Sequence, residues 1–333
     1  METKGKVLIL GATGGIGSET ARRLIEEKWD VRALKRGLQG SEQRNGIQWT
    51  PGDVLDPEQV KAAASGCDVI VHAVNPPGYR NWKGLVLPMV RNTIKAAEQN
   101  NALIVLPGTL YNYGPDAFPL IRENARQRPL TRKGAIRVEM EQELAAWSQR
   151  GGRVLIVRAG DFFGPHAGNN WFSQGLVKPG SLPTVINNPG TPGIGHQWAY
   201  LPDMAATVAA LLARRDELEP FACFQMQGHW DPDGSTMSRA IQRTVASYGG
   251  AAKIQSFPWW LTYLAAPFST TLREILEMRY LWRQPVRMDN TKLVTFLGAE
   301  PHTPLDEAIE TTLQGLGCIR HAARPRPPLA GSR

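Results

Sequence analysis

The chain has 333 residues, of which 42% are hydrophobic and 20% are charged, and this composition is typical of a soluble globular protein. Its length exceeds the usual size of one domain, so we expect two lobes. The formal net charge of +8 does not indicate a nucleic-acid partner, because half of the excess lies in four arginines of the Pro-rich stretch Arg320–Arg333, which has no acidic residue. We expect residues 319–333 to form a disordered basic tail.

The cysteines and histidines argue against a protein held together by disulfides and against a metal-binding protein. Cys67, Cys223 and Cys318 are widely separated and odd in number, which argues against a disulfide framework or a structural zinc site and indicates a reducing, cytoplasmic compartment. The six histidines show no metal-ligand spacing, so we expect no metal, and we expect His166 and His196 to be loop residues that line or cap the substrate lobe.

No segment predicts export or stable membrane insertion. The chain enters its first predicted strand almost at once, which leaves no room for a signal peptide, and no apolar run reaches transmembrane length. The apolar, Trp-rich segment Pro258–Phe268 is expected to pack on a partner lobe or a second subunit, with contact to a membrane surface as the alternative.

The first predicted strand, Val7–Leu10, runs directly into a glycine-rich turn, and the helix Gly15–Glu27 follows. Gly11 permits the tight turn, Gly14 lets the backbone approach phosphates, and Gly17 lets the helix lie close to the strand. The unpaired N–H groups at the start of the helix favour an anion. This pattern predicts a dinucleotide site, with an ordinary strand–helix turn as the alternative. Its expected ligands in the turn are Gly11, Thr13, Gly14, Gly15, Ile16 and Gly17.

Strands and helices alternate through the first half of the chain, which predicts an α/β fold with a Rossmann-like, doubly wound parallel sheet. The further strands are expected at Asp30–Leu34, Gln48–Trp49, Asp68–Ala73, Leu103–Leu106 and Val154–Arg158. The helices between them are expected at Pro57–Ala64, Val86–Asn100 and Gly134–Arg150.

The pattern changes after Gly164. Residues 165–196 are rich in Pro, Gly and Asn and are expected to form a long functional loop. A helix at Ala199–Arg214 and a strand at Phe221–Gln227 follow, and the remaining helices are expected at Ser235–Tyr248, Leu272–Arg283 and Leu305–Leu316. We therefore assign 1–165 and 197–230 to a dinucleotide-binding domain, and 166–196 and 231–318 to a smaller, discontinuous α/β substrate lobe.

Motifs spread over roughly residues 5–315 resemble those of the atypical and extended short-chain dehydrogenases/reductases, the NAD-dependent epimerase/dehydratase superfamily. The glycine turn is similar to the GxxGxxG loop of that superfamily. Six further segments resemble its motifs in the same order: Pro51–Asp56, His72–Asn75, Thr109–Gly114, Val157–Pro165, His196–Ala205 and Met288–Gly298. The resemblance implies an NAD(P)-binding enzyme that acts on a small carbonyl, alcohol or sugar-nucleotide-like substrate.

The end of the second predicted strand favours NADP over NAD. An NAD site needs an acidic residue there for the ribose hydroxyls, whereas this strand ends in Lys35 and Arg36, which can pair with a 2′-phosphate. Two solvated cations are the alternative. The resemblance implies further cofactor contacts, at the adenine from Asp53 and Val54 and at the nicotinamide end from Ala73, Val74 and Asn75.

The resemblance also implies a catalytic tyrosine with a lysine four residues later on one helix, assisted by a serine or threonine. Thr109 occupies the serine or threonine position. Lys133 occupies the tyrosine position, and Arg137 occupies the lysine position. Glu141 occupies the position of the glutamate that follows in the family motif. The usual proton donor is therefore absent. Arg137 cannot act as an acid or base but could bind the cofactor ribose or an anionic substrate.

Three side chains could replace the missing tyrosine. Lys133 could deliver a proton if burial or a neighbouring cation such as Arg137 weakened its hold on that proton. Tyr111 lies two residues beyond Thr109, and Tyr79 begins a Tyr-x-x-x-Lys sequence after the fourth strand. The resemblance places substrate contacts in the long loop, at Asn169, Asn170, Trp171 and Lys178.

Three functions remain open from the sequence. The first is an oxidoreductase or epimerase with a non-standard proton donor, and the second is a non-catalytic NADP(H)-binding redox sensor. The third is an isomerase that never releases its cofactor. The helices Val86–Asn100 and Gly134–Arg150 correspond to those that pair in dimeric relatives, so a homodimer is one expected assembly.

Overall fold

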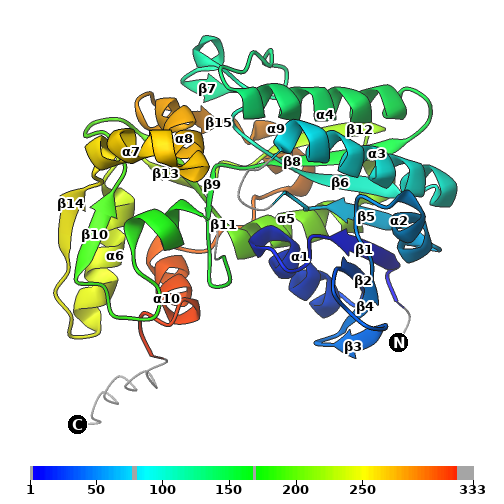
Figure 1. Ribbon diagram of the computed structural model, residues 1–333, viewed down its shortest axis with the longest axis horizontal. Coiled ribbons are helices and arrows are strands. Elements are labelled where there is room, and N and C mark those ends of the chain that lie inside the picture. The colour runs from blue at the N-terminus through cyan, green and yellow to red at the C-terminus, as the bar shows by residue number, and fades with distance from the viewer. Residues whose placement is uncertain (1–2, 77–80, 168–169, 321–333) are drawn as a thin grey trace, which may run out of the picture.

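The computed structural model describes residues 3–76, 81–167 and 170–320. Tyr79, Asn169 and residues 321–333 of the predicted tail lie outside the described residues. The predicted start of that tail at residue 319 is wrong, because Ile319 is buried in an apolar cluster of the smaller lobe. A large central sheet with helices on both faces forms one side of the molecule, and a smaller lobe of helices and short strands forms the other (Figure 1).

The central sheet has eight strands, and every neighbouring pair is parallel except the edge pair formed by β3 and β4. The predicted α/β, Rossmann-like parallel sheet is confirmed. From one edge to the other the strands are β12 (Phe221–Gln225), β8 (Arg153–Arg158), β6 (Leu103–Gly108), β5 (Val69–His72), β1 (Lys6–Leu10), β2 (Asp30–Lys35), β4 (Ile47–Pro51) and β3 (Glu42–Arg44).

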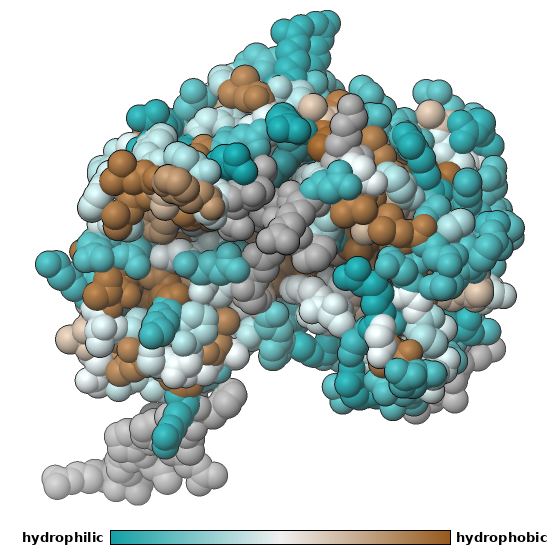
Figure 2. All heavy atoms as spheres, viewed as in Figure 1, coloured by the Kyte–Doolittle hydropathy of each residue, from teal (hydrophilic) through white to brown (hydrophobic). Residues whose placement is uncertain are grey.

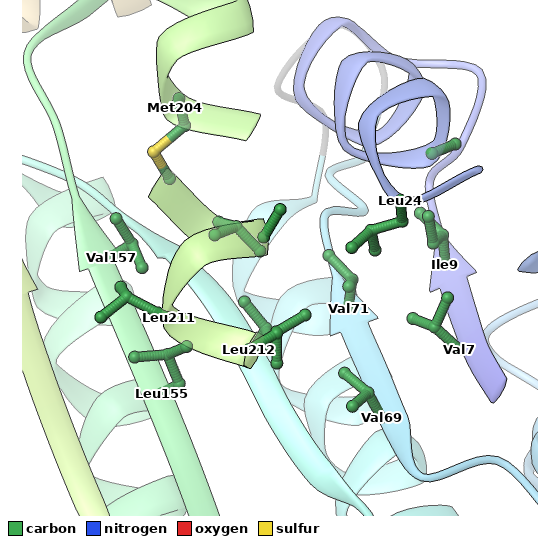
Figure 3. Packing of buried hydrophobic residues seen from close by; sticks show 14 of the residues in the cluster. Val7, Ile9, Leu24, Val69, Val71, Leu155, Val157, Met204, Leu211 and Leu212 are labelled. Carbon is green, nitrogen blue, oxygen red and sulfur yellow. The ribbon is translucent and has the colours of Figure 1, made fainter. Parts of the chain in front are cut away.

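Helices cover both faces of the sheet, so both faces are buried. Successive strand residues point to opposite faces. Val7 and Ile9 contact one apolar cluster, and Leu8 and Leu10 contact another. Figure 3 shows the first cluster, where Leu24 of α1 and Leu211 and Leu212 of α5 pack on the strands. The helices on this face are α1 (Gly15–Glu26), α5 (Leu201–Ala213) and α9 (Thr291–Leu297), and those on the other face are α2 (Pro57–Ala64), α3 (Trp82–Asn100) and α4 (Arg132–Ser148).

The strand order reverses direction between β1 and β5. From β1 the chain passes to β2 and β4 on one side, and it then returns to build β5, β6, β8 and β12 on the other. In open parallel sheets the carboxyl ends of the strands leave a crevice at such a reversal, and ligands bind there. The glycine turn after β1 lies at this position.

The smaller lobe contains α6 (Thr236–Ser247), α7 (Trp259–Ala265), α8 (Thr270–Glu277) and α10 (Leu305–Gly315), and the strands β10 (Val185–Asn188) and β14 (Lys253–Ser256) pair within it. A second small sheet joins β9 (Asp161–Phe163), β11 (His196–Tyr200) and β13 (His229–Asp231). β7 (Leu120–Ile121) pairs with β15 (Arg287–Met288). Short turns of helix are η2 (Pro115–Ala117), η3 (Phe172–Leu176), η4 (Arg215–Glu217), η5 (Ala266–Phe268) and η6 (Arg279–Trp282).

Several predicted boundaries in the second half are wrong. Residues 165–196 are not all loop, because they contain η3 and β10. His196–Tyr200 is a strand whose five residues are all buried, so it shows no alternation that would reveal it, and α5 begins only at Leu201. The helix expected at Leu272–Arg283 is divided into α8 and η6. α9 was not predicted, and its apolar side chains pack against the central sheet rather than the smaller lobe.

The apolar segment Pro258–Phe268 forms α7 and η5. Five of its large side chains are exposed, with Phe268 the most exposed at 92%. Figure 2 shows hydrophobic atoms gathered on the surface over α7 and α8. None of the helices formed by residues 3–76, 81–167 and 170–320 is both long and apolar enough to cross a membrane. The exposed side chains of this segment are Trp260, Leu261, Tyr263, Leu264 and Phe268.

Candidate functional site

The glycine turn is shaped by contacts that exclude a larger residue at two positions. Gly11 has a φ of +91°, and a Cβ there would lie 2.5 Å from the carbonyl oxygen of Ala73. A Cβ on Gly17 would lie 2.2 Å from the carbonyl oxygen of Gly11, so α1 can pack this close to the turn only with glycine at that position. Protein packing alone therefore explains Gly11 and Gly17.

Gly14 needs a different explanation. Its φ of −88° suits any residue, and the nearest atom to a Cβ there would be the carbonyl oxygen of Gly11 at 3.4 Å. Gly14 also lines the main cavity and precedes α1, whose first turn has no acidic residue and no side-chain cap. The first turn of α1 therefore begins at the cavity wall without a side-chain cap, and the N–H groups of a helix start favour an anion such as a pyrophosphate.

The main cavity has a volume of about 820 Å³, and its wall includes parts of the central sheet and of the smaller lobe. Residues from the turn and from the ends of β2, β4 and β5 form one part of the wall. They include most of the predicted cofactor contacts, namely Gly11, Thr13, Gly14, Gly15, Ile16, Lys35, Arg36, Asp53, Val54, Ala73, Val74 and Asn75.

Two cationic residues, Lys35 and Arg36, lie at the end of β2. The Lys35 ammonium lies 5.6 Å from the centre of the Trp49 ring. The Arg36 guanidinium is mostly exposed and lies 3.8 Å from the Asp53 carboxylate. Asp53 also accepts a hydrogen bond from the backbone N–H of Leu55, as in an ordinary turn.

A buried polar network lies behind Thr109. The Thr109 hydroxyl donates to Asn112 Oδ1 at 2.7 Å, and Asn112 Nδ2 donates to the Glu141 carboxylate at 2.8 Å. Arg158 donates to both oxygens of Glu141 and to the carbonyl oxygen of Thr109. Burial alone would raise the pKa of Glu141, but the Arg158 guanidinium outweighs it and lowers that pKa, so the carboxylate is ionised.

This network sets the hydrogen-bonding direction of Thr109. Because Asn112 Nδ2 faces a carboxylate, its Oδ1 faces Thr109, and the hydroxyl proton is used within the protein. The Thr109 oxygen then has only lone pairs to offer to the cavity, which it lines. It can accept a hydrogen bond from an ammonium or an alcohol.

Lys133 and Arg137 lie one turn apart near the start of α4, and both are buried and line the cavity. The Lys133 ammonium and the Arg137 guanidinium lie 6.0 Å and 5.4 Å from the centre of the Trp82 ring. Arg137 also donates to the Asn75 side chain at 2.6 Å. The cationic pair expected from the sequence therefore lines the cavity, beside Trp82 and the Asn75 side chain.

Tyr111 lines the same cavity, although it follows β6 in a turn rather than in an extended strand. Its carbonyl oxygen would lie 2.1 Å from a Cβ on Gly134, so the start of α4 is packed directly against it. Tyr113 points elsewhere: it is buried, and the Arg158 guanidinium lies 5.1 Å from its ring centre. Burial raises the pKa of the Tyr113 phenol.

The smaller lobe supplies an apolar wall. Among the described residues that line the cavity, this lobe contributes no lysine or arginine. Trp171 and Asn170 line it as predicted, but the Asn170 side chain also caps the next turn by accepting from Ser173. Lys178 does not line the cavity and its side chain is exposed. The apolar lining residues that the sequence did not reveal are Phe257, Ile275, Met278, Leu281 and Trp282.

The expectation for His196 is wrong. It is a buried strand residue that stacks on Trp282 at 3.7 Å between ring centres and hydrogen-bonds to Asp161 at 2.8 Å. It therefore supports the apolar wall from behind. His166 is exposed, and it does not line the main cavity.

His72 predicts a measurable pH dependence. Burial, with a smaller effect of Arg137, lowers its pKa from 6.5 to about 3. Below about pH 6.5 the unfolded chain therefore binds a proton that the folded chain does not, and this contribution to the free energy of unfolding is lost as the pH falls. Between about pH 7 and about pH 5.5 the free energy of unfolding falls in both proteins. Measured by urea unfolding, we expect it to fall by about 1 kcal/mol less in His72→Gln than in the wild type. The exposed His166→Gln variant should match the wild type, and an unchanged slope in His72→Gln would contradict the prediction.

Comparison with known proteins agrees with this geometry. Residues 7–221 match the family model described as the NAD dependent epimerase/dehydratase family. A 2-alkyl-3-oxoalkanoate reductase of Shewanella oneidensis is 34% identical over 70 residues, which are 21% of this chain and 18% of that protein. The match thus spans less than a fifth of that relative.

Two solved structures show the same fold over nearly the whole chain. A putative epimerase from Burkholderia cenocepacia has a TM-score of 0.71 at 16% identity, covering 95% of this chain and 99% of that one. UDP-glucuronic acid 4-epimerase from Bacillus cereus, in complex with UDP-glucuronic acid and NAD, has a TM-score of 0.70 at 15% identity, covering 93% and 98%. The family match over residues 7–221 decides the assignment: the chain belongs to the NAD dependent epimerase/dehydratase family.

Proposed function

We propose that this protein is an NADPH-dependent reductase of a small carbonyl compound with an apolar body. One observation carries the proposal: Thr109, Lys133 and Arg137 line a cavity whose described smaller-lobe residues include aromatic and aliphatic side chains and no cation. Such a wall binds an apolar substrate by burial of its surface. The exposed apolar side chains of α7 and η5 belong to the segment that joins two parts of this wall, which also suits a lipophilic substrate.

The proposed chemistry uses residues of the central-sheet side of the cavity. When bound, the reduced nicotinamide supplies a hydride to the carbonyl carbon. The Lys133 ammonium donates a proton to the oxygen that becomes the hydroxyl, and it regains one from solvent. An alkoxide is far more basic than an amine, so this transfer is downhill in the direction of reduction. The Thr109 oxygen accepts a hydrogen bond from Lys133 or from the product alcohol and orients it.

Reduction also removes the difficulty left by the missing tyrosine. The Lys133 ammonium is the acid form of its side chain, and reduction requires an acid that gives a proton to the carbonyl oxygen. The side chains present therefore favour reduction. Arg137, held by Asn75 and Trp82, would bind the ribose of the cofactor or a carboxylate on the substrate.

Sugar nucleotides are the competing substrate class, and the Bacillus cereus structure holds one. A nucleoside diphosphate carries negative charge that cations usually bind. The described part of the smaller-lobe wall contributes only one charged side chain, Asp161, and it is acidic. The name of the Shewanella oneidensis relative, a 2-alkyl-3-oxoalkanoate reductase, is consistent with an alkyl-bearing carbonyl substrate.

The preference for NADPH is the first property to test. Calorimetric titration should give at least about tenfold tighter binding of NADPH than of NADH, because Lys35 and Arg36 line the cavity at the end of β2 and can pair with a 2′-phosphate. Arg36→Ala should weaken NADPH about tenfold and leave NADH nearly unchanged. Arg44→Ala, at a cation on the neighbouring edge strand outside the cavity, serves as the control. Equal loss of both dinucleotides in Arg36→Ala would contradict the assignment.

Turnover decides between the proposed reductase and the alternatives. Purified protein is mixed with NADPH and, separately, a 2-alkyl-3-oxo acid, an apolar ketone and UDP-glucose, and oxidation of the dinucleotide is followed by absorbance. We expect oxidation with the first two and none with UDP-glucose. Conversion of the sugar nucleotide without net oxidation would indicate an epimerase. The absence of the family tyrosine favours a second candidate, a redox sensor, and tight binding without turnover of any compound would support it.

A further inference from the structure

A second group of side chains lies outside the main cavity, where α5, β13 and the segment before α10 meet. Asp203, His229 and His302 each offer a donor atom, and these three atoms lie within 4.8 Å of one another. The ring centres of the two histidines are 4.5 Å apart. The three residues are distant in sequence, so their spacing gave no signal of a site.

Two of these side chains are buried, and one of them, His229, lacks a hydrogen bond that burial normally requires. His229 is 7% exposed, and its Nε2 has no hydrogen-bond partner among the described residues. Asp203 is also 7% exposed, and within residues 3–76, 81–167 and 170–320 no cation forms an ion pair with it. An unpartnered ring nitrogen and a buried carboxylate without an ion pair both cost free energy, and a bound cation would offset both costs.

The surroundings fix these groups in place. Thr303 donates to both oxygens of Asp203, from its backbone N–H at 2.8 Å and from its hydroxyl at 2.7 Å. Each carboxylate oxygen keeps a lone pair, and the same contact holds the adjacent His302 beside Asp203. Outer hydrogen bonds of this kind orient metal ligands in known sites. His229 is held edge-on against Phe163, with ring centres 5.6 Å apart.

We propose that Asp203, His229 and His302 bind a divalent transition-metal ion such as zinc. Two imidazoles and one carboxylate are a ligand set that such ions accept, whereas magnesium and calcium prefer oxygen alone. Donors about 2 Å from one ion lie about 3–4 Å apart, so the side chains must close by about 1 Å. His302 is the exposed member of the group, and movement of its side chain can supply this difference. A water molecule completes the coordination.

The bound ion would connect three separate elements of the structure. Asp203 belongs to a helix on the central sheet, His229 to the small three-stranded sheet, and His302 to the segment that leads into α10 of the smaller lobe. The site therefore stabilises the junction of the two lobes, and it takes no part in the proposed reduction.

Zinc binding by untagged, chelator-treated protein tests the proposal. Calorimetric titration with ZnCl₂ should give one saturable site per chain with low-micromolar or tighter affinity, and zinc should raise the Tm by at least about 2 °C. His302→Gln should weaken binding at least about tenfold and abolish the Tm increase. His302 is exposed, so this variant leaves the core intact.

His166→Gln is the matched control, because His166 is exposed and lies outside the group. It should bind zinc as the wild type does. Asp203→Asn should also weaken zinc binding, and this variant changes no histidine. Magnesium should give no saturable binding. The proposal is overturned if the wild type shows no saturable zinc site, or if His302→Gln binds zinc as tightly as the wild type.

Discussion

Gly14→Val is expected to abolish dinucleotide binding while the protein stays folded. A Cβ at this position meets no protein atom closer than 3.4 Å, and the φ of −88° is allowed for valine. The side chain would instead fill the space in front of the first turn of α1, where we propose that the pyrophosphate binds. We expect at least about a 100-fold loss of NADPH affinity by calorimetry, with a Tm decrease of no more than about 3 °C.

Two other glycines provide the controls for that variant. Gly40→Val, at a position with no atom within 4 Å of the new Cβ, should leave both affinity and Tm unchanged. Gly17→Ala should lower the Tm strongly, because its Cβ would lie 2.2 Å from the Gly11 carbonyl oxygen. If Gly14→Val still binds NADPH with wild-type affinity, the turn is an ordinary strand–helix connection.

Lys133→Met is expected to lower kcat by about 1,000-fold while NADPH affinity stays within about threefold of wild type. Methionine keeps the length and the apolar stem of the side chain, so it removes the proton donor with little change in packing. Lys133 is buried beside Trp82 and lines the cavity, which explains why the loss should appear in kcat. Steady-state kinetics with the best substrate of the panel, together with calorimetry, separates the two effects.

The remaining candidate donors make this prediction falsifiable. Tyr111→Phe and Tyr79→Phe should each keep most of the activity, and the loss of turnover in either variant with an active Lys133→Met would identify a relocated tyrosine. Lys178→Met is the matched lysine control, because Lys178 is exposed and does not line the cavity. It should behave as the wild type does.

The sequence predicted the central sheet well because its strands are continuous apolar runs. Val7–Leu10 and Leu103–Leu106 are buried on both faces, so hydrophobicity alone identifies them. The glycine turn is equally clear, because its spacing follows from local backbone geometry. These local signals also placed most of the predicted cofactor contacts on one cavity.

The part of the cavity wall that the smaller lobe supplies could not be predicted from the sequence in the same way. Its wall is made of residues such as Phe257, Met278 and Trp282, which look like ordinary core residues until the chain brings them together. The network behind Thr109 was missed for the same reason, because Asn112 and Gln127 reach Glu141 only in three dimensions. The Asp203, His229 and His302 group joins three distant segments and has no local pattern at all.

The apolar wall comes mainly from two continuous stretches of chain, 170–175 and 257–282, and neither contributes a strand to the central sheet. Substrate range can therefore diverge among descendants of one ancestor by exchange of these two stretches, while the sheet and its glycine turn are inherited unchanged. A protein built in this way can acquire a new substrate without having to evolve a new cofactor site.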